Sequence, residues 1–295
     1  MKQCLYFGFI LVVCALGAFV LLNEYIYQEK QEPNELPVGE VTLTGVVTAV
    51  DTQQMMVDGP AVVTIISPVG EMHDILLPSM GRGLCAAGEN VADVSLVKEG
   101  DAVEVRGEMT EAGVVPCSSD IHYFRIFDRV VDDVAKYEFT YRKAPAGYVT
   151  YPTEGMSVDP DFVSGFILIG EDESEEMAGA VDVPRESPPT MQGRVYQNAD
   201  NESAIDWAMS HPLESNIELA LSAPRMVMID HEEAVLYKAD GLYASDVYVV
   251  THGDFVYVFS GSYIDANSPI VKDFASLIRS VVFLNSAHSD PVDQH

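Results

Sequence analysis

The cysteines are the first residues whose chemistry the sequence constrains. Cys4 and Cys14 lie in or beside an apolar N-terminal segment, which leaves Cys85 and Cys117 in the rest of the chain. Neither belongs to a CxxC motif, and a metal site would need more ligands near them. Two cysteines exported to an oxidising compartment most often pair. The sequence therefore predicts a Cys85–Cys117 disulfide, and two free buried thiols are the alternative.

A run of carboxylates is the second group that could do chemistry. Oxygen ligands are those that Ca²⁺ prefers, so the run is a candidate calcium site. A run of like charges is more often a solvated loop. This run and residues 184–189 together predict a long loop. The five carboxylates are Glu171, Asp172, Glu173, Glu175 and Glu176.

No linear motif of a catalytic or cofactor site occurs in the sequence. There is no G-x-S-x-G elbow, Walker loop, H-E-x-x-H, EF-hand loop or dinucleotide-binding glycine pattern. His231 and the two glutamates after it lack a second histidine at helical spacing and predict a turn between strands. Ser260 and Ser262 lie at a strand end without a nearby His–Asp pattern. We therefore predict no catalytic residues, no cofactor and no enzymatic activity.

The N-terminal segment determines the expected compartment. Residues 5–22 carry no charge over 18 residues, which is enough to span the hydrocarbon core as a helix. Lys2 precedes the segment and Glu24 follows it, so the positive-inside rule places the N-terminus in the cytoplasm and the body outside. We predict a transmembrane signal-anchor over 1–23 and a stalk over 24–40, in a single-pass protein of the cell membrane.

Two other interpretations of this segment stay open. Ala15-Leu16-Gly17 is a passable signal-peptide cleavage site, although cleavage would leave an apolar stub at 19–22. Residues 11–14 partly resemble a lipoprotein signal, but they lack the small residues before the cysteine. All three interpretations export the body of the chain.

The charge balance excludes some partners. The formal net charge is −30, from 46 acidic and 16 basic residues. A body this acidic repels phosphate backbones and anionic lipid headgroups, which argues against nucleic-acid binding. The acidity keeps the protein soluble, or it serves to bind a cation or a basic partner. The partners that we expect are the membrane, through the N-terminal helix, and an envelope protein or a small ligand.

Short strands dominate residues 41–128. Five strands with a short helix between the third and fourth form the pattern of an OB-fold barrel. The stretches VTLTGVVTAVD, VKEGDAVEVRGEM and HYFRIF carry a resemblance of residues 40–128 to small bacterial OB-type domains of exported proteins. OB-folds bind oligonucleotides or oligosaccharides, but we expect the aromatics Tyr123, Phe124 and Phe127 to be mainly core. The expected strands are 41–51, 61–66, 72–77, 102–108 and 121–127, and the expected helix is 90–97.

Residues 128–134 are predicted to link this barrel to a second domain over 135–285 that folds without it, followed by a disordered tail over 286–295. Tyr137, Phe139 and Tyr141 alternate on one face of a strand. Ser203 is expected to cap a helix over 204–210. The other expected strands are 162–169, 226–229, 233–237, 242–251 and 255–263.

The last predicted helix, 269–281, has Ser268 as its expected N-cap. One stripe of this helix is apolar and covers a sheet, whereas Asp273 and Lys272 face water. The stripe consists of Ile270, Phe274, Leu277 and Val281.

The C-terminal region resembles the PsbP family of photosystem II extrinsic proteins and their bacterial relatives. The segments that carry the resemblance are KYEFTYR, GLYASDVYVVTHGDFVYVFSGSY and NSPIVKDFASLIRSVVF. The resemblance implies an α/β sandwich that acts in assembly or scaffolding and has no catalytic residues. The expected fold class is therefore α+β: a transmembrane helix, an OB-like five-stranded barrel, and an antiparallel sheet covered by helices.

These observations predict a membrane-anchored extracytoplasmic binding or assembly module without catalytic activity. Such a module would bind a protein partner or a small ligand. The alternatives are a cell-envelope hydrolase whose site has no linear motif, and an oligosaccharide-binding protein that uses the OB-like face. A clustered set of serine, histidine and carboxylate side chains in one cleft would favour the hydrolase.

Overall fold

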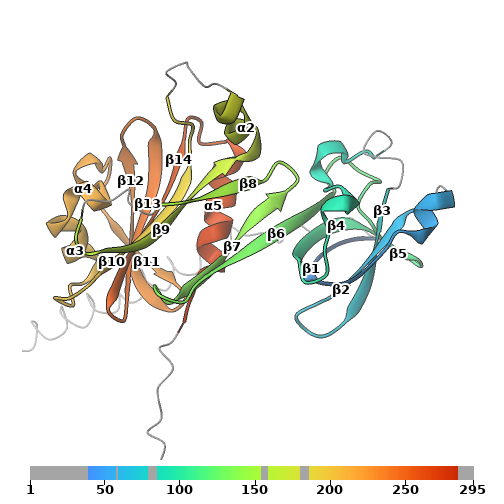
Figure 1. Cartoon of the computed structure of the whole chain (residues 1–295), viewed down its shortest axis with the longest axis horizontal. Helices are drawn as coiled ribbons and strands as arrows, with labels where there is room; N and C mark the ends of the chain where they lie inside the picture. The colour runs from blue at the N-terminus through green and yellow to red at the C-terminus, as the bar shows by residue number, and fades with distance from the viewer. Residues whose placement is uncertain (1–38, 58, 79–84, 154–158, 180–185, 285–295) are drawn as a thin grey trace, which may run out of the picture. The chain divides into compact units, whose positions relative to one another are not determined.

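The structure is a computed structural model that describes residues 39–57, 59–78, 85–153, 159–179 and 186–284. The predicted membrane helix over 5–22, most of the stalk and the tail from 286 lie outside the described residues. Among the residues that are described, no helix is long and apolar enough to cross a membrane. The described chain is a mixed α+β protein that contains a closed barrel and a second sheet (Figure 1).

The barrel is closed by five strands, but the strand predicted at 121–127 is not one of them: the fifth is a short strand at Gly113–Val115 that the sequence did not predict. Strands β1, β2 and β3 follow one another in antiparallel pairs, β3 pairs with β5 in parallel, β5 pairs with β4, and β4 closes the barrel on β1. Their inward side chains are apolar, because period-2 alternation places one face of each strand in the interior. The strands are β1 (Glu40–Asp51), β2 (Ala61–Ile66), β3 (Met72–Leu77), β4 (Ala102–Thr110) and β5 (Gly113–Val115).

The helix predicted at 90–97 is instead two short 3-10 turns, η3 (Gly88–Asn90) and η4 (Val94–Leu96). Val91 lies between them and forms an isolated bridge with Phe124. This pairing holds the backbone of Val91 extended, so a continuous helix cannot form across it. A third turn, η1 (Gln53–Val57), precedes β2.

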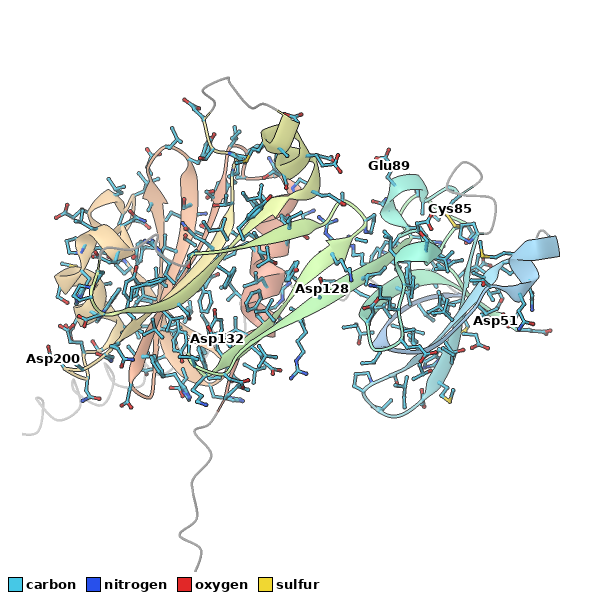
Figure 2. The ribbon with its side chains drawn as sticks, in the orientation of Figure 1. Asp51, Cys85, Glu89, Asp128, Asp132 and Asp200 are labelled. Carbon is cyan, nitrogen blue, oxygen red and sulfur yellow. A yellow bond between two sulfur atoms is a disulfide. The ribbon has the colours of Figure 1, made fainter. Side chains whose placement is uncertain are left out.

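The sheet of the barrel continues beyond it. Strand β6 (Tyr123–Asp132) pairs with the first half of β4 and then with β7 (Tyr137–Ala144). The link predicted at 128–134 is therefore mostly strand, and Figure 2 shows Asp128 and Asp132 along β6. The polar residues of this segment suggested a linker, but Asp132 accepts the backbone N–H of Ala135 at 2.8 Å and closes the β6–β7 turn.

The second sheet has seven antiparallel strands in the order β11-β12-β13-β14-β10-β9-β8. The two-residue strand β15 (Val282–Phe283) pairs with β7 instead. The sequence predicted the strong hairpin β13–β14 but missed β8 and β10. The bounds are β8 (Tyr148–Pro152), β9 (Phe162–Gly170), β10 (Met191–Gln197), β11 (Arg225–Ile229), β12 (Glu232–Asp240), β13 (Ala244–His252) and β14 (Phe255–Tyr263).

Helix α5 (Pro269–Ser280) packs between β7 and β14 on one face of this sheet. The predicted stripe is confirmed, because Phe274, Leu277 and Val281 are buried in the core and Ile270 packs against it. Ser268 occupies the N-cap position, but its hydroxyl donates to the carbonyl of Asp265 at 2.6 Å and caps no helical N–H.

The opposite face is covered by α3 (Ala204–Ser210), α4 (Pro212–Ser215) and the turn η5 (Ile217–Leu219). Trp207 packs there against Tyr196 and is fully buried. The predicted cap of α3 is present, since the Ser203 hydroxyl accepts the N–H of Asp206 at 3.3 Å.

The acidic run predicted as a loop is the helix α2 (Glu171–Gly179). Glutamate is a good helix former. Carboxylates in a first helical turn are also stabilised by the helix dipole. These two effects outweigh the repulsion between like charges that a loop would have relieved.

Candidate functional site

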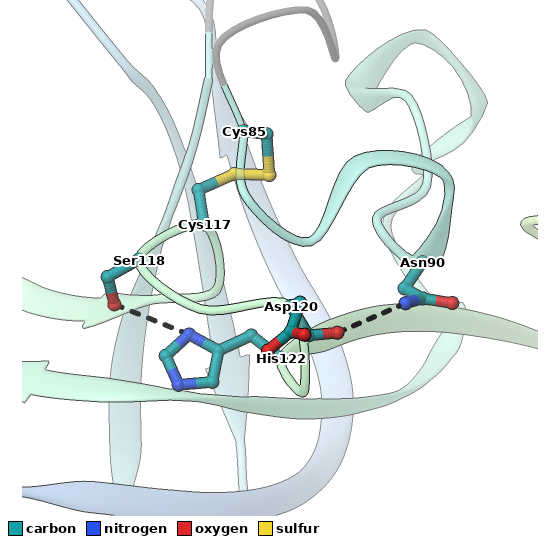
Figure 3. The surroundings of a disulfide bond; sticks show 6 residues. All are labelled: Cys85, Asn90, Cys117, Ser118, Asp120 and His122. Atoms are coloured by element: carbon teal, nitrogen blue, oxygen red, sulfur yellow. Dashed lines mark hydrogen bonds between the residues drawn. A yellow bond between two sulfur atoms is a disulfide. The ribbon is translucent and has the colours of Figure 1, made fainter.

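The predicted disulfide is present. Cys85 and Cys117 are bonded (Figure 3), with their Cα atoms 4.6 Å apart. The N–H of Ala86 donates to the carbonyl of Cys117 at 2.9 Å. On the same loop, the Ser118 hydroxyl lies 3.3 Å from Nδ1 of the buried His122. Cys85 is buried and Cys117 is partly buried, and their bond joins the segment before η3 to the segment before β6 as a structural cross-link.

A pocket of about 510 Å³ opens where α2 and α5 begin. The turn between β7 and β8 and the segment between β14 and α5 also contribute to it. Its walls are mainly carbon, from Pro145, Ala146, Pro189, Ile264, Pro269 and Ile270. The volume falls in the range of small-molecule sites, so this pocket is the candidate binding site.

Two side chains that line the pocket, Arg142 and Tyr148, both contact Asp273 of α5 behind the lining. The guanidinium of Arg142 pairs with the carboxylate of Asp273, and the Tyr148 hydroxyl donates to the same Asp273 Oδ2 at 2.8 Å. The Arg142 and Asp273 side chains are 14% and 17% exposed. The sequence placed Asp273 on the water-facing side of its helix, and this was wrong, because Arg142 on β7 reaches across to pair with it.

Burial raises the pKa of Tyr148 well above its usual range, and the Asp273 carboxylate beside it raises that pKa further. The tyrosine therefore stays neutral and remains a hydrogen-bond donor at physiological pH. The Nε of Arg142 is buried and has no hydrogen-bond partner among the described side chains and backbone. The charges of Arg142 and Asp273 cancel locally.

The rim of the pocket is acidic. Of the five predicted calcium candidates, Glu171, Asp172 and Glu173 line the pocket, and Glu89 and Asp265 add two more carboxylates. Glu175 and Glu176 lie further along α2 and do not line it. Within the described ranges, no group of three or more His, Cys, Asp or Glu side chains is arranged to hold a metal ion. The calcium site stays a prediction.

A serine, a histidine and a carboxylate cluster at the end of α3. The Ser210 hydroxyl lies 2.9 Å from Nδ1 of His211 and 3.1 Å from both carboxylate oxygens of Glu202. A catalytic triad needs the carboxylate to orient the histidine and the histidine to accept the serine proton. Here the carboxylate takes the serine hydroxyl directly, and His211 Nδ1 is also 3.1 Å from the carbonyl of Trp207. These contacts close the end of α3.

The other candidates from the sequence have structural roles. His231 lies in the β11–β12 turn with a positive φ of 70°. The carboxylate Oε1 of the next residue, Glu232, lies 2.8 Å from Nδ1 of His252. Ser260 is buried in β14, and the Ser262 hydroxyl accepts the N–H of Thr190 at 2.7 Å.

The barrel aromatics divide between core and surface. Phe124 is fully buried, whereas Tyr123 lies on the outer face, with Arg125 above its ring at 4.1 Å. The Tyr123 hydroxyl donates to Glu104 at 2.8 Å. Burial, and then the negative charge of Glu104, raises the pKa of Tyr123 to about 12. Arg125 thus covers a ring face on which a sugar or base would stack.

Sequence reasoning did not find Arg142 or Tyr148. Arg142 lies 131 residues from Asp273, so no local spacing connects the two. The available signal was a single arginine within an aromatic strand, and such a signal does not by itself indicate a site.

The architecture defines a mixed α+β protein with a closed barrel and an antiparallel sheet flanked by helices. No protein-family model and no curated protein matches the chain. The cyanobacterial PsbP (CyanoP) from Synechocystis sp. PCC 6803 is similar at 14% identity and a TM-score of 0.36, over 53% of this chain and 92% of that one. A crystal structure from Bacteroides thetaiotaomicron VPI-5482 is similar at 11% identity and a TM-score of 0.33, over 54% of this chain. This chain spans about half, 48%, of that second protein.

Proposed function

We propose that the protein is an extracytoplasmic binding or assembly module without catalytic activity, held to the membrane by a helix over 5–22. Its body combines an OB-like barrel with a PsbP-like sandwich. The pocket at the start of α2 and α5 is its ligand site. The observation that carries the proposal is the composition of this pocket: carbon walls, five lining carboxylates, and one arginine, Arg142, whose charge is paired with Asp273.

The pocket favours a cationic group carried on an apolar stem. Carboxylates around a concave site concentrate negative potential there. The walls offer apolar surface to a stem of several methylene groups. An alkyl ammonium has this chemistry, whether it belongs to a free amine or to a lysine side chain of a protein partner. The described residues that line the pocket include no nucleophile hydrogen-bonded to a base.

Calorimetric titration of the purified full-length chain tests this proposal. The probe is 1,5-diaminopentane, and pimelate is the control with the same five-methylene stem and opposite charge. We expect Glu171→Gln with Glu173→Gln to weaken diamine binding at least tenfold, which corresponds to about 1.4 kcal/mol. The matched control, Glu175→Gln with Glu176→Gln, removes the same charge from α2 outside the pocket and should leave binding unchanged. Equal weakening by both pairs, or equal binding of pimelate, would contradict a specific site.

A cell-envelope hydrolase is the second candidate, because Ser210, His211 and Glu202 do cluster. If these residues formed a catalytic site, a fluorophosphonate probe would label the chain, and Ser210→Ala would abolish the label. We expect no labelling of the unmodified chain, since the serine hydroxyl is already bonded to a carboxylate and a helix carbonyl.

A further inference from the structure

The 3-10 turn η3 belongs to the barrel segment, yet it forms part of the wall of the pocket. Glu89 and Asn90 of η3 line this pocket, together with residues of α2 and of the segment before α5. Of the described carboxylates that line the pocket, Glu89 alone comes from the barrel segment. Both side chains are exposed, so the core of the barrel does not fix them. The completeness of the site therefore depends on what holds η3 in place.

Upstream of η3, the chain is attached to the loop that begins at Cys117. The disulfide from Cys85 makes the covalent attachment, and the N–H of Ala86 donates to the carbonyl of Cys117 at 2.9 Å. The Asn90 side-chain amide also donates to the carbonyl of Asp120 in this loop, at a longer distance of 3.4 Å (Figure 3). The disulfide is the strongest of these attachments, because the other two are single hydrogen bonds near the surface.

The loop of Cys117 is the fixed side of this attachment. His122 at the end of the loop is buried, and its Nδ1 lies 3.3 Å from the Ser118 hydroxyl. Downstream of η3, the bridge between Val91 and Phe124 joins the chain to β6. Neither contact involves the disulfide, so both persist when the sulfur–sulfur bond is absent. Only the upstream end of η3 is then released.

We propose that the pocket is complete only in the oxidised chain, because the disulfide holds η3 and its Glu89 at the pocket wall. This inference rests on the proposed function and concerns the regulation of the same site. The two thiols lose two protons and two electrons when they form the bond, and a disulfide oxidant of the exporting compartment accepts them and becomes two thiols. In the reduced chain η3 fluctuates about Val91, and a cationic ligand has to order it on binding, which lowers affinity. Tight binding is thereby restricted to the exported, oxidised form.

Calorimetric titration of 1,5-diaminopentane into the full-length chain carrying Cys4→Ser and Cys14→Ser tests the proposal. We expect reduction by dithiothreitol to weaken diamine binding about fivefold or more, because binding then has to order η3. Cys85→Ala with Cys117→Ala should bind as weakly as the reduced chain and should not respond to dithiothreitol. Equal affinity before and after reduction would overturn this inference and leave the proposed function intact. No diamine binding by the oxidised chain would contradict the proposed function itself, and this inference with it.

Glu89→Gln tests whether reduction acts through η3. In the oxidised chain this change should weaken diamine binding about threefold or more, because it removes one of the carboxylates that attract the cation. Reduction should then cause a smaller further loss than in the unmodified chain, since both changes remove the same contact. The matched control is Glu99→Gln, which removes an exposed carboxylate of the barrel segment outside the pocket and should leave the full response to reduction. The same response in both variants would overturn the inference.

Hydrogen exchange of the chain without ligand measures how far the effect of reduction extends. The N–H of Ala86 donates to the carbonyl of Cys117, and the N–H of Gly88 donates to the carbonyl of Cys85 at 3.0 Å. We expect both amides to exchange faster after reduction, whereas the amides of β2 and β3 keep their protection. Unchanged exchange at Ala86 and Gly88, or an equal loss of protection throughout β2 and β3, would refute a local attachment of η3 by the disulfide.

Discussion

The ring of Phe274 lies directly against the backbone of Gly261. A Cβ placed on Gly261 would be 2.4 Å from the Phe274 ring, which is closer than real atoms approach. Gly261 is in β14 and Phe274 is in the middle of α5, so the missing side chain at 261 allows the helix to lie close to the sheet. The packing of α5 therefore depends on one large residue and one absent side chain.

This contact predicts a specific set of stability changes. Phe274→Ala should lower the free energy of unfolding by about 3–5 kcal/mol, because it removes a buried ring. Gly261→Ala should cost about 1–3 kcal/mol through overpacking. Lys272→Ala, on the exposed face of the same helix, should change it by no more than about 0.5 kcal/mol. Urea melts of the full-length chain measure each value.

A double variant tests whether Gly261 and Phe274 interact. With Phe274→Ala already in place, Gly261→Ala should cost less than it does alone, because the ring that it would clash with is gone. Additive costs would show that the two residues do not interact. Equal effects of Phe274→Ala and Lys272→Ala would show that α5 faces the other way.

Removing one partner of the Arg142–Asp273 pair should destabilise the protein more than replacing both partners with apolar residues. Asp273→Asn leaves the Arg142 guanidinium without its counter-charge in a largely buried position and should cost about 3 kcal/mol. Replacing both partners, Arg142→Met with Asp273→Leu, should cost less than Asp273→Asn alone, because no charge is then left unpaired. Thermal melts near neutral pH would measure this, and a double variant less stable than Asp273→Asn would contradict it.

The sequence predicted those elements that local pattern determines. Strands β2, β3 and β14 and helix α3 have the predicted bounds, since alternation and a Ser–Asp cap are local signals. Strand β10 was missed because Gly193 and Arg194 interrupt its pattern. Gly193 is needed there for another reason, as a Cβ at that position would be 2.4 Å from the Phe166 ring.

Features set by tertiary contact could not be predicted. The linker expected at 128–134 is strand because Val130 packs against the sandwich core and Asp132 accepts the Ser164 hydroxyl at 2.7 Å. A segment beginning at 135 lacks these contacts, so stability experiments require the longer chain. The candidate site likewise depends on Arg142 meeting Asp273 across two elements, which no window of sequence contains.

Reducing the disulfide should destabilise the barrel. The cysteines are 32 residues apart, and closing a loop of that size is worth about 3–4 kcal/mol in the chain-entropy model. We expect a lower melting temperature in the presence of a reductant, and the same shift in Cys85→Ala with Cys117→Ala. Reductant should cause no further change in that double variant. Two free thiols, counted in a denatured and unreduced chain lacking Cys4 and Cys14, would refute the bond.

The proposed membrane anchor predicts a defined topology. A reporter that is active only outside the cytoplasm, fused after residue 295, should be active. The fusion should stay in the membrane fraction after a high-salt wash, because an apolar helix is not released by screening charge. The matched control replaces Leu11 and Val12 with aspartate, which should prevent insertion of the segment. Release of an active body into the medium would instead favour cleavage after 15–17.

Stability should fall above pH 10 because several buried tyrosines resist ionisation. Tyr237 is fully buried and donates to the carbonyl of Ser215 at 2.6 Å. Burial raises its pKa to about 12, and burial likewise raises the pKa of Tyr257 above its ordinary value. The ordinary tyrosine pKa is about 10. The folded chain therefore holds these protons more tightly than the unfolded chain. The stability that they contribute is complete below pH 10 and is lost as the pH rises towards 12.

Urea melts at pH 8, 10 and 11 should show this fall in stability. The fall should be shallower in Tyr237→Phe, because phenylalanine cannot ionise. Absorbance at 295 nm should show part of the 14 tyrosines titrating late in the folded chain. Titration of all of them near pH 10, with the fold intact, would contradict the buried positions.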